Sequence, residues 1–135
     1  MSDTDNRLTL LASDADDLPV LSALLQDAIV QAGDIDWDRR RRRLVLLASR
    51  FRWEAGETSR VRTALRIQTI QKVERQRWPA DPETPLVLLS ITARGTQIEL
   101  AFADQIGLRV TIECLDVLLE DMSAPWDVRH RPHHE

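Results

Sequence analysis

The chain of 135 residues has little cysteine, glycine or aromatic content. Its single cysteine excludes an internal disulfide and a cysteine-based zinc knuckle. Aromatic residues make up 4% of the chain and tyrosine is absent, which argues against an aromatic stacking platform for single-stranded nucleic acid. The four glycines form no phosphate-binding loop motif.

Long apolar runs are absent as well. The longest strictly apolar run, residues 44–48, is far shorter than the roughly 20 residues of a membrane helix. Residues 1–6 are acidic and polar and do not resemble a signal peptide, so we expect a cytoplasmic protein. With 43% hydrophobic and 30% charged residues, the composition predicts a single globular domain over residues 1–135, with mobile ends at about 1–6 and 127–135.

Charge is divided unevenly along the chain, although the net charge is only −4. Residues 1–38 carry one base and nine acids, residues 39–77 carry thirteen bases and three acids, and residues 78–135 carry four bases and ten acids. The three parts therefore have charges of −8, +10 and −6. Such a division predicts either a basic surface for an external anion or a basic segment that folds against its own acidic flanks.

One segment has helical periodicity, with apolar residues three or four positions apart between Leu18 and Ala32 and Gly33 as a stop signal. Pro19 lacks an amide hydrogen and belongs in the first turn, which favours Asp16 as the N-cap. We therefore predict an amphipathic N-terminal helix that ends at Gly33.

Further along, the apolar pattern has a period of two, which is typical of β-strands. The predicted strands cover residues 44–53, 61–67, 86–93, 97–102 and 108–114. The phase slips near Thr69, which predicts a bulge there, and residues 115–122 match a helix and a strand equally well. The order of elements predicts an α+β fold, with the helix packed on a curved, mostly antiparallel sheet of about five to seven strands.

Strand parity predicts an arginine-rich face on the hairpin of residues 44–53 and 61–67. If Phe51 and Trp53 share the core face with Val61, strand pairing places the arginines that alternate with these apolar residues on the opposite face. This predicted face consists of Arg50, Arg52, Arg60, Arg62 and Arg66. Because like charges across a sheet repel each other, the cluster requires anions nearby.

Two sources of anions remain open. Acidic segments of the same chain can cover the face, and most charged faces are paired internally or solvated. Alternatively, the anion is an acidic protein, a phosphate or RNA, although the net negative charge disfavours nucleic acid at long range. Within the arginine run at residues 39–43, Arg41 and Arg43 are further candidate contacts, unless the run is a solvated loop before a strand.

The sequence gives only weak signals for a catalytic or metal-binding site. Cys114 has the parity of Val110 in the apolar strand pattern, so we predict a buried structural cysteine. The three histidines lie in the last six residues, where a mobile terminus offers no rigid metal geometry. Asp34, Asp36 and Asp38 alternate as in a calcium loop, but the required glycine and bidentate glutamate are missing. We therefore predict no metal, cofactor or catalytic residue, with an unrecognised acid-based enzyme site as an alternative.

Several short motifs spread over nearly the whole chain. They are DADDL at 14–18, LLQDA at 24–28, RFRWE at 50–54, ECLD at 113–116, LED at 119–121, PW at 125–126 and RHRP at 129–132. In order and spacing they resemble an uncharacterised alphaproteobacterial family, the domain of unknown function 2948 family. The resemblance implies a small cytoplasmic bacterial protein with no assigned activity, cofactor or catalytic residue. The unbroken arginine run departs from the more mixed stretch of that family, which puts a family-wide role for the run in doubt.

Together, these observations predict a non-enzymatic interaction module whose contact surface is the arginine face. A phosphate- or RNA-binding domain that uses the same face is the alternative.

Overall fold

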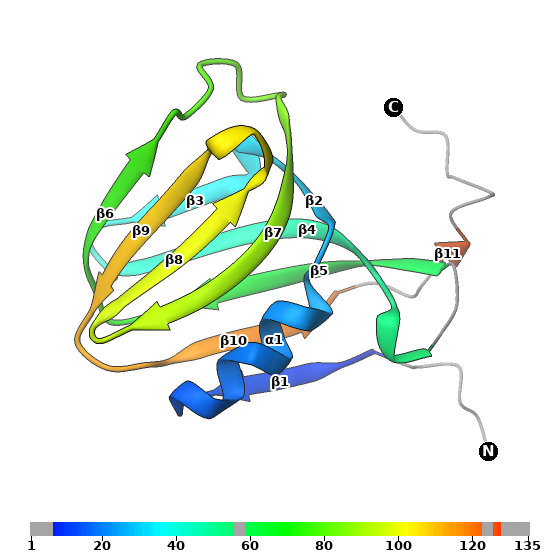
Figure 1. The fold of residues 1–135 in the computed structure, drawn as a ribbon, viewed down its shortest axis with the longest axis horizontal. Coiled ribbons are helices and arrows are strands. Elements are labelled where there is room, and N and C mark those ends of the chain that lie inside the picture. The colour runs from blue at the N-terminus through cyan, green and yellow to red at the C-terminus, as the bar shows by residue number, and fades with distance from the viewer. Residues whose placement is uncertain (1–6, 56–58, 123–125, 128–135) are drawn as a thin grey trace.

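The computed structural model describes residues 7–55, 59–122 and 126–127, which form one antiparallel sheet and a short helix (Figure 1). The helix, α1 (Leu18–Leu24), follows a single 3-10 turn, η1 (Ala15–Asp17). The strands are β1 (Thr9–Ala12), β2 (Ala28–Gln31), β3 (Ile35–Asp38), β4 (Arg43–Phe51), β5 (Ser59–Ile67), β6 (Ile70–Gln76), β7 (Pro85–Arg94), β8 (Gln97–Phe102), β9 (Gly107–Ile112), β10 (Val117–Asp121) and β11 (Trp126–Asp127). Further 3-10 turns lie at η2 (Ala32–Asp34), η3 (Trp53–Ala55) and η4 (Ala103–Gln105).

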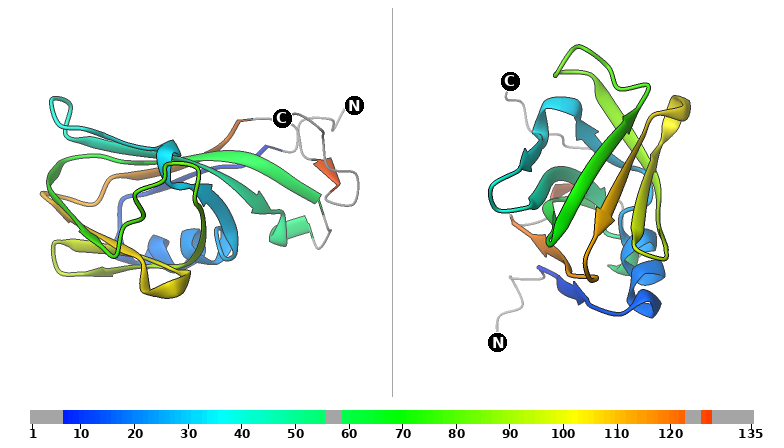
Figure 2. Two further views of the ribbon diagram at one scale, coloured as in Figure 1. Left: turned by 90° about the horizontal axis from the view of Figure 1, so that it is seen from above. Right: turned by 90° about the vertical axis from the view of Figure 1, so that its left-hand side faces the viewer.

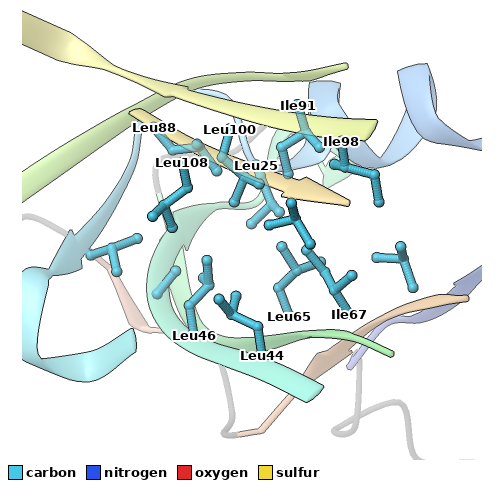
Figure 3. Close-up of a cluster of buried hydrophobic side chains, with 14 of the residues drawn as sticks. Leu25, Leu44, Leu46, Leu65, Ile67, Leu88, Ile91, Ile98, Leu100 and Leu108 are labelled. Carbon is cyan, nitrogen blue, oxygen red and sulfur yellow. The ribbon is translucent and has the colours of Figure 1, made fainter. Parts of the chain in front are cut away.

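The strand order across the sheet is β1-β10-β5-β4-β2-β7-β8-β9-β6, with β3 paired to β4 and β11 paired to β5. The sheet curls so that β4 and β5 face β8 and β9 (Figure 2). Leucine and isoleucine side chains from both halves fill the space between them, among them Leu44 and Leu65 from one half and Leu100 and Leu108 from the other (Figure 3). The hydrophobic core therefore lies inside one curved sheet.

The helix α1 packs beside β7 and β1 through Leu18 and Leu21, which are both buried. This confirms an α+β fold with an N-terminal helix on an antiparallel sheet, but the sheet has more strands than the five to seven that we predicted.

The predicted helix is too long, because α1 ends at Leu24. Asp27 has a φ of 64°, which directs the chain away from the helical path into β2. In and after β2, the residues Ala28, Val30 and Ala32 are buried at every second position, so the apolar spacing also fits a strand. The predicted N-cap is also wrong. Asp14 caps η1, and this extra turn keeps the following proline in the first turn of α1.

The five predicted strands are present as β4, β5, β7, β8 and β9, and the ambiguous segment 115–122 contains the strand β10. Near Thr69 the phase change marks the end of β5 and the start of β6, while the register irregularity lies between Ile70 and Lys72. The predicted burial of Cys114 is wrong: it is exposed, because β9 ends at Ile112 and the cysteine lies in the turn that follows. Its backbone N–H donates to Thr69 Oγ1 at 3.3 Å.

In the described ranges, no helix has the length and apolar character needed to cross a membrane. The histidines at positions 130, 133 and 134 lie outside the described residues, as does most of the predicted mobile C-terminal end.

Candidate functional site: the arginines of the β4–β5 hairpin

The register of β4 and β5 divides the predicted arginine face in two. Arg50 lies opposite Val61, whereas Phe51 lies opposite Arg60 and Ser49 opposite Arg62. Residues opposite each other share a face. Arg50 therefore points to the inner face of the curved sheet, whereas Arg60 and Arg62 point to its outer face. The predicted parity is therefore wrong for Arg50.

The error comes from treating Phe51 and Trp53 as a core-facing pair. The strand β4 ends at Phe51, and Trp53 lies in the 3-10 turn η3, where strand alternation no longer applies. Phe51 is on the outer face, and Trp53 is 47% exposed with its indole N–H donating to the Gln26 carbonyl at 3.1 Å. An apolar residue near a strand end is thus a poor guide to strand parity.

The Arg50 side chain is completely buried, and all of its guanidinium nitrogens donate hydrogen bonds within the chain. Nε donates to Asp121 Oδ1 at 3.0 Å and Nη2 donates to Asp121 Oδ2 at 2.9 Å. The two terminal nitrogens bind both carboxylate oxygens of Glu54 at 3.0 and 2.9 Å, and Nη1 also donates to the Phe51 carbonyl at 3.0 Å. This arrangement uses the five donors of the guanidinium and leaves Arg50 unavailable to an external anion.

The electrostatics of this buried cluster follow from its hydrogen bonds. Burial by itself lowers the pKa of Arg50, but the hydrogen bonds to Glu54 and Asp121 outweigh it and raise the pKa above its ordinary value. The same hydrogen bonds lower the pKa of Glu54, against a smaller opposing effect of burial. Arg50 and Glu54 therefore hold each other in their charged forms.

Asp121 extends the cluster to the N-terminal part of the chain. Its Oδ2 accepts a hydrogen bond from the Leu8 backbone N–H at 2.9 Å, and its own N–H donates to the Leu8 carbonyl at 2.9 Å. The cluster thus ties together β4, the turn η3, β10 and the residue before β1. Its role is structural.

The remaining hairpin arginines on the outer face are Arg60, Arg62 and Arg66, together with Arg43 at the start of β4; we call these four the outer arginine face. Arg60 is tied to its neighbours: its Cζ lies 3.9 Å from the centroid of the Phe51 ring, and its Nη1 donates to Ser49 Oγ at 2.8 Å. Although it lies on the outer side of the sheet, Arg60 is only 8% exposed.

Arg62 and Arg66 differ from Arg50 in their electrostatic surroundings. Among the described residues, no carboxylate oxygen lies within 4.0 Å of either guanidinium, although the exposed Glu120 lies on the same face of β10. Arg66 lies between Val45 and Leu118 on the adjacent strands, and its buried Nε has no hydrogen-bond partner. The Nε of Arg43 is likewise buried without a partner.

Arg52 follows the end of β4 and belongs to neither face. Its Nη1 donates to Ser59 Oγ at 3.2 Å, and its backbone N–H donates to the Ser59 carbonyl at 3.1 Å. These bonds join the end of β4 to the start of β5.

In the arginine run, residues 39–42 form the turn between β3 and β4, and Arg43 is the first residue of β4. Arg41 forms an ion pair with Asp38 at 3.0 Å, and the hydrogen bonds from Arg41 lower the pKa of Asp38. Arg42 donates to the Ile70 carbonyl at 3.1 Å and pairs with Glu113 at 3.3 Å. Of the two candidate contacts in this run, Arg41 thus has a carboxylate of its own, whereas Arg43 lies on the outer arginine face.

Sequence reasoning missed the partners of Arg50. Glu54 stands four residues after it in the RFRWE motif, but across a strand end this spacing carries no helical pairing signal. Asp121 is 71 residues away, and only the pairing of β10 with β5 brings it close. Over the part of the chain that the structure describes, histidine, cysteine and acidic residues form no group of three that would suit a metal ion.

Comparison with known proteins identifies a family. The model of a family described as a protein of unknown function, DUF2948, matches residues 8–134. Neither the curated proteins nor the solved structures yield a match. Because the family model covers nearly the whole chain, from before β1 to the C-terminal motif RHRP, the chain belongs to the DUF2948 family of proteins of unknown function.

Proposed function

We propose that this chain is an interaction module and that its outer arginine face binds an acidic surface of a partner protein. The observation that carries the proposal is the state of Arg62 and Arg66, which lie on one face of β5 with no carboxylate partner in the described part of the chain. The structural arginine, Arg50, is fully paired on the other side of the same hairpin. Arg62 and Arg66, unlike Arg50, are therefore available to bind an external anion.

Apolar residues between these arginines favour a protein partner over RNA. Val45, Leu47 and Leu118 lie on the same outer face and are half-buried, and Leu11 on β1 is 58% exposed. Arginine mixed with apolar side chains is typical of the core of a protein interface. The negative net charge of the chain also opposes long-range attraction to nucleic acid.

A binding experiment with defined polyanions tests the proposal. Poly-L-glutamate serves as the protein-like probe and poly(U) RNA as the nucleic acid probe, each titrated by fluorescence anisotropy at several salt concentrations. We expect the Arg62→Gln/Arg66→Gln variant to bind poly-L-glutamate roughly tenfold more weakly than the wild type, since it loses two surface ion pairs with the probe, each of up to about 1 kcal/mol.

The matched control is Arg94→Gln/Arg109→Gln, which removes the same charge from exposed arginines on β7 and β9. Equal weakening in this control overturns the proposal, because it means that net charge alone determines binding. Tighter binding of poly(U) than of poly-L-glutamate, lost in the Arg62→Gln/Arg66→Gln variant, assigns the face to RNA instead.

A further inference from the structure

A cavity of about 350 Å³ opens between the edge strands β3 and β6. Among the described strands, β3 pairs only with β4 and β6 only with β9, so no strand pairing joins these two edges (Figure 2). At one end the gap is closed by the Ile70 N–H, which donates to the Arg42 carbonyl at 2.9 Å. At the other end the Gly33 N–H donates to the Pro82 carbonyl at 2.7 Å. The cavity lies between these two closures.

Apolar side chains on the inner face of the sheet form most of its lining. Leu44 and Leu108 are almost fully buried. The half-buried Trp37, opposite Leu44 on β3, and Val73 on β6 also contribute. Two arginines also line the cavity, so apolar and polar surface meet there. A volume above 300 Å³ with apolar side chains and a few polar groups is typical of sites for small organic ligands.

Trp78, in the loop after β6, is held in place by its neighbours. Its ring contacts Phe102 edge to face with the centroids 6.0 Å apart, and Phe102 is buried in the core. The Cζ of Arg75 lies 5.7 Å from the centroid of the Trp78 ring, within the range of a cation–π contact. A flat apolar ring and a guanidinium that lies over it are thus both present at the cavity.

The charged residues in the described lining of the cavity are two arginines. Arg75 lies opposite Leu108, so it is on the inner side of β6, and Arg39 is the first arginine of the run after β3. Among the described residues, no acidic side chain lines the cavity, and neither arginine has a carboxylate oxygen within 4.0 Å. A cavity that combines apolar side chains with two arginines, neither of which has a carboxylate partner in the described part of the chain, is suited to a ligand that carries a negative charge.

We propose that this cavity binds a small organic anion with a flat, apolar ring, of the class of aromatic carboxylates and aromatic phosphate esters. The ring packs against Trp37 and Trp78, and Arg39 and Arg75 donate hydrogen bonds to the anionic group. The site lies between β3 and β6 and is separate from the outer arginine face, so it stands independently of the proposed protein interaction.

Isothermal titration calorimetry with three matched ligands tests the proposal on the intact chain. The ligands are 2-naphthoate, 2-naphthyl phosphate and the neutral 2-naphthamide. We expect at least one anion to bind about tenfold or more tightly than the amide, because only the anions form charge-assisted hydrogen bonds with the arginines. The anion that binds more tightly identifies the carboxylate or the phosphate as the preferred group.

Variants then locate the binding. Arg39→Gln/Arg75→Gln changes two exposed residues, and we expect it to reduce binding of the preferred anion about tenfold and to weaken 2-naphthamide much less. Arg62→Gln/Arg66→Gln removes the same charge from the outer arginine face and is expected to bind the anion like the wild type. Trp37→Leu is expected to weaken all three ligands.

Three results overturn the proposal. They are equal affinity for the anions and the amide, unchanged anion binding in Arg39→Gln/Arg75→Gln, and no saturable binding of any of the three ligands at millimolar concentration. The first and third use only the wild-type chain, so they decide the question even if a variant fails to fold. None of these results depends on whether the outer arginine face binds a partner.

Discussion

The two faces of the β4–β5 hairpin place arginines in opposite physical situations. Arg50 on the inner face is buried and its guanidinium donates to two carboxylates and a carbonyl, whereas Arg62 on the outer face is exposed and has no carboxylate nearby in the described part of the chain. A charge without water requires partners, because an unpaired buried ion costs several kcal/mol. An exposed charge has no such requirement. The same residue type is therefore structural on one face and available for binding on the other.

The strongest test of this difference removes Arg50. We expect Arg50→Met to lower the free energy of unfolding by about 3–5 kcal/mol, because it leaves the Asp121 carboxylate buried without its countercharge. Arg62→Met is the matched control on the outer face and is expected to change the free energy of unfolding by no more than about 0.5 kcal/mol. Urea denaturation followed by tryptophan fluorescence measures both.

A double-mutant cycle sharpens the same test. Asp121→Leu combined with Arg50→Met removes both charges, so we expect the double variant to be more stable than the sum of the single losses implies. Additive losses, or a stable Arg50→Met variant, contradict the structural role that we assign to the buried pair.

The acid sensitivity of the inner cluster is a smaller effect. Because Arg50 lowers the pKa of Glu54 in the folded chain, the Glu54 carboxylate stabilises the fold at a pH above its ordinary pKa of 4.5, and this contribution disappears as the pH falls through the lowered value. We expect wild type and Glu54→Gln to differ in free energy of unfolding at pH 6 and to converge in acid. A difference that stays constant from pH 6 to pH 3 contradicts the assignment.

The smallest expected effect on the free energy of unfolding concerns Arg60, the buried arginine of the outer arginine face, whose guanidinium lies over the Phe51 ring. Phe51→Leu removes the ring beneath its guanidinium and is expected to cost about 0.5–1 kcal/mol beyond the loss of packing. Comparing this loss in the wild-type and Arg60→Met backgrounds isolates the cation–π contact. An equal loss in both backgrounds shows that the contact contributes nothing to stability.

The strands with long, regular alternation were predictable from sequence. β4, β5, β8 and β9 each bury every second residue over much of their length, which is the pattern that a period of two predicts. In β7 the alternation is interrupted by a register shift between Leu88 and Ser90. β1, β2 and β3 are four residues long, too short for periodicity to separate them from a helix or a turn. The helix was overestimated for the same reason, since the four-residue spacing of Ala28 and Ala32 satisfies both patterns.

The candidate site was predictable only in part. Parity correctly grouped Arg60, Arg62 and Arg66 on one face of β5, because these residues alternate along a single strand. It failed for Arg50, because relating two strands requires their register, and register depends on contacts that are distant in sequence. The cavity between β3 and β6 also depends on long-range geometry, since its two arginines are 36 positions apart.

The pairing of β1 with β10 determines when β1 can fold during synthesis of the chain. Among the described strands, β1 pairs only with β10, and Leu8 and Asp121 are separated by 113 positions. In a chain that is made from its N-terminus, β1 is translated long before its partner exists. β1 therefore cannot pair until β10 has been translated, so it is expected to be among the last strands to join the sheet.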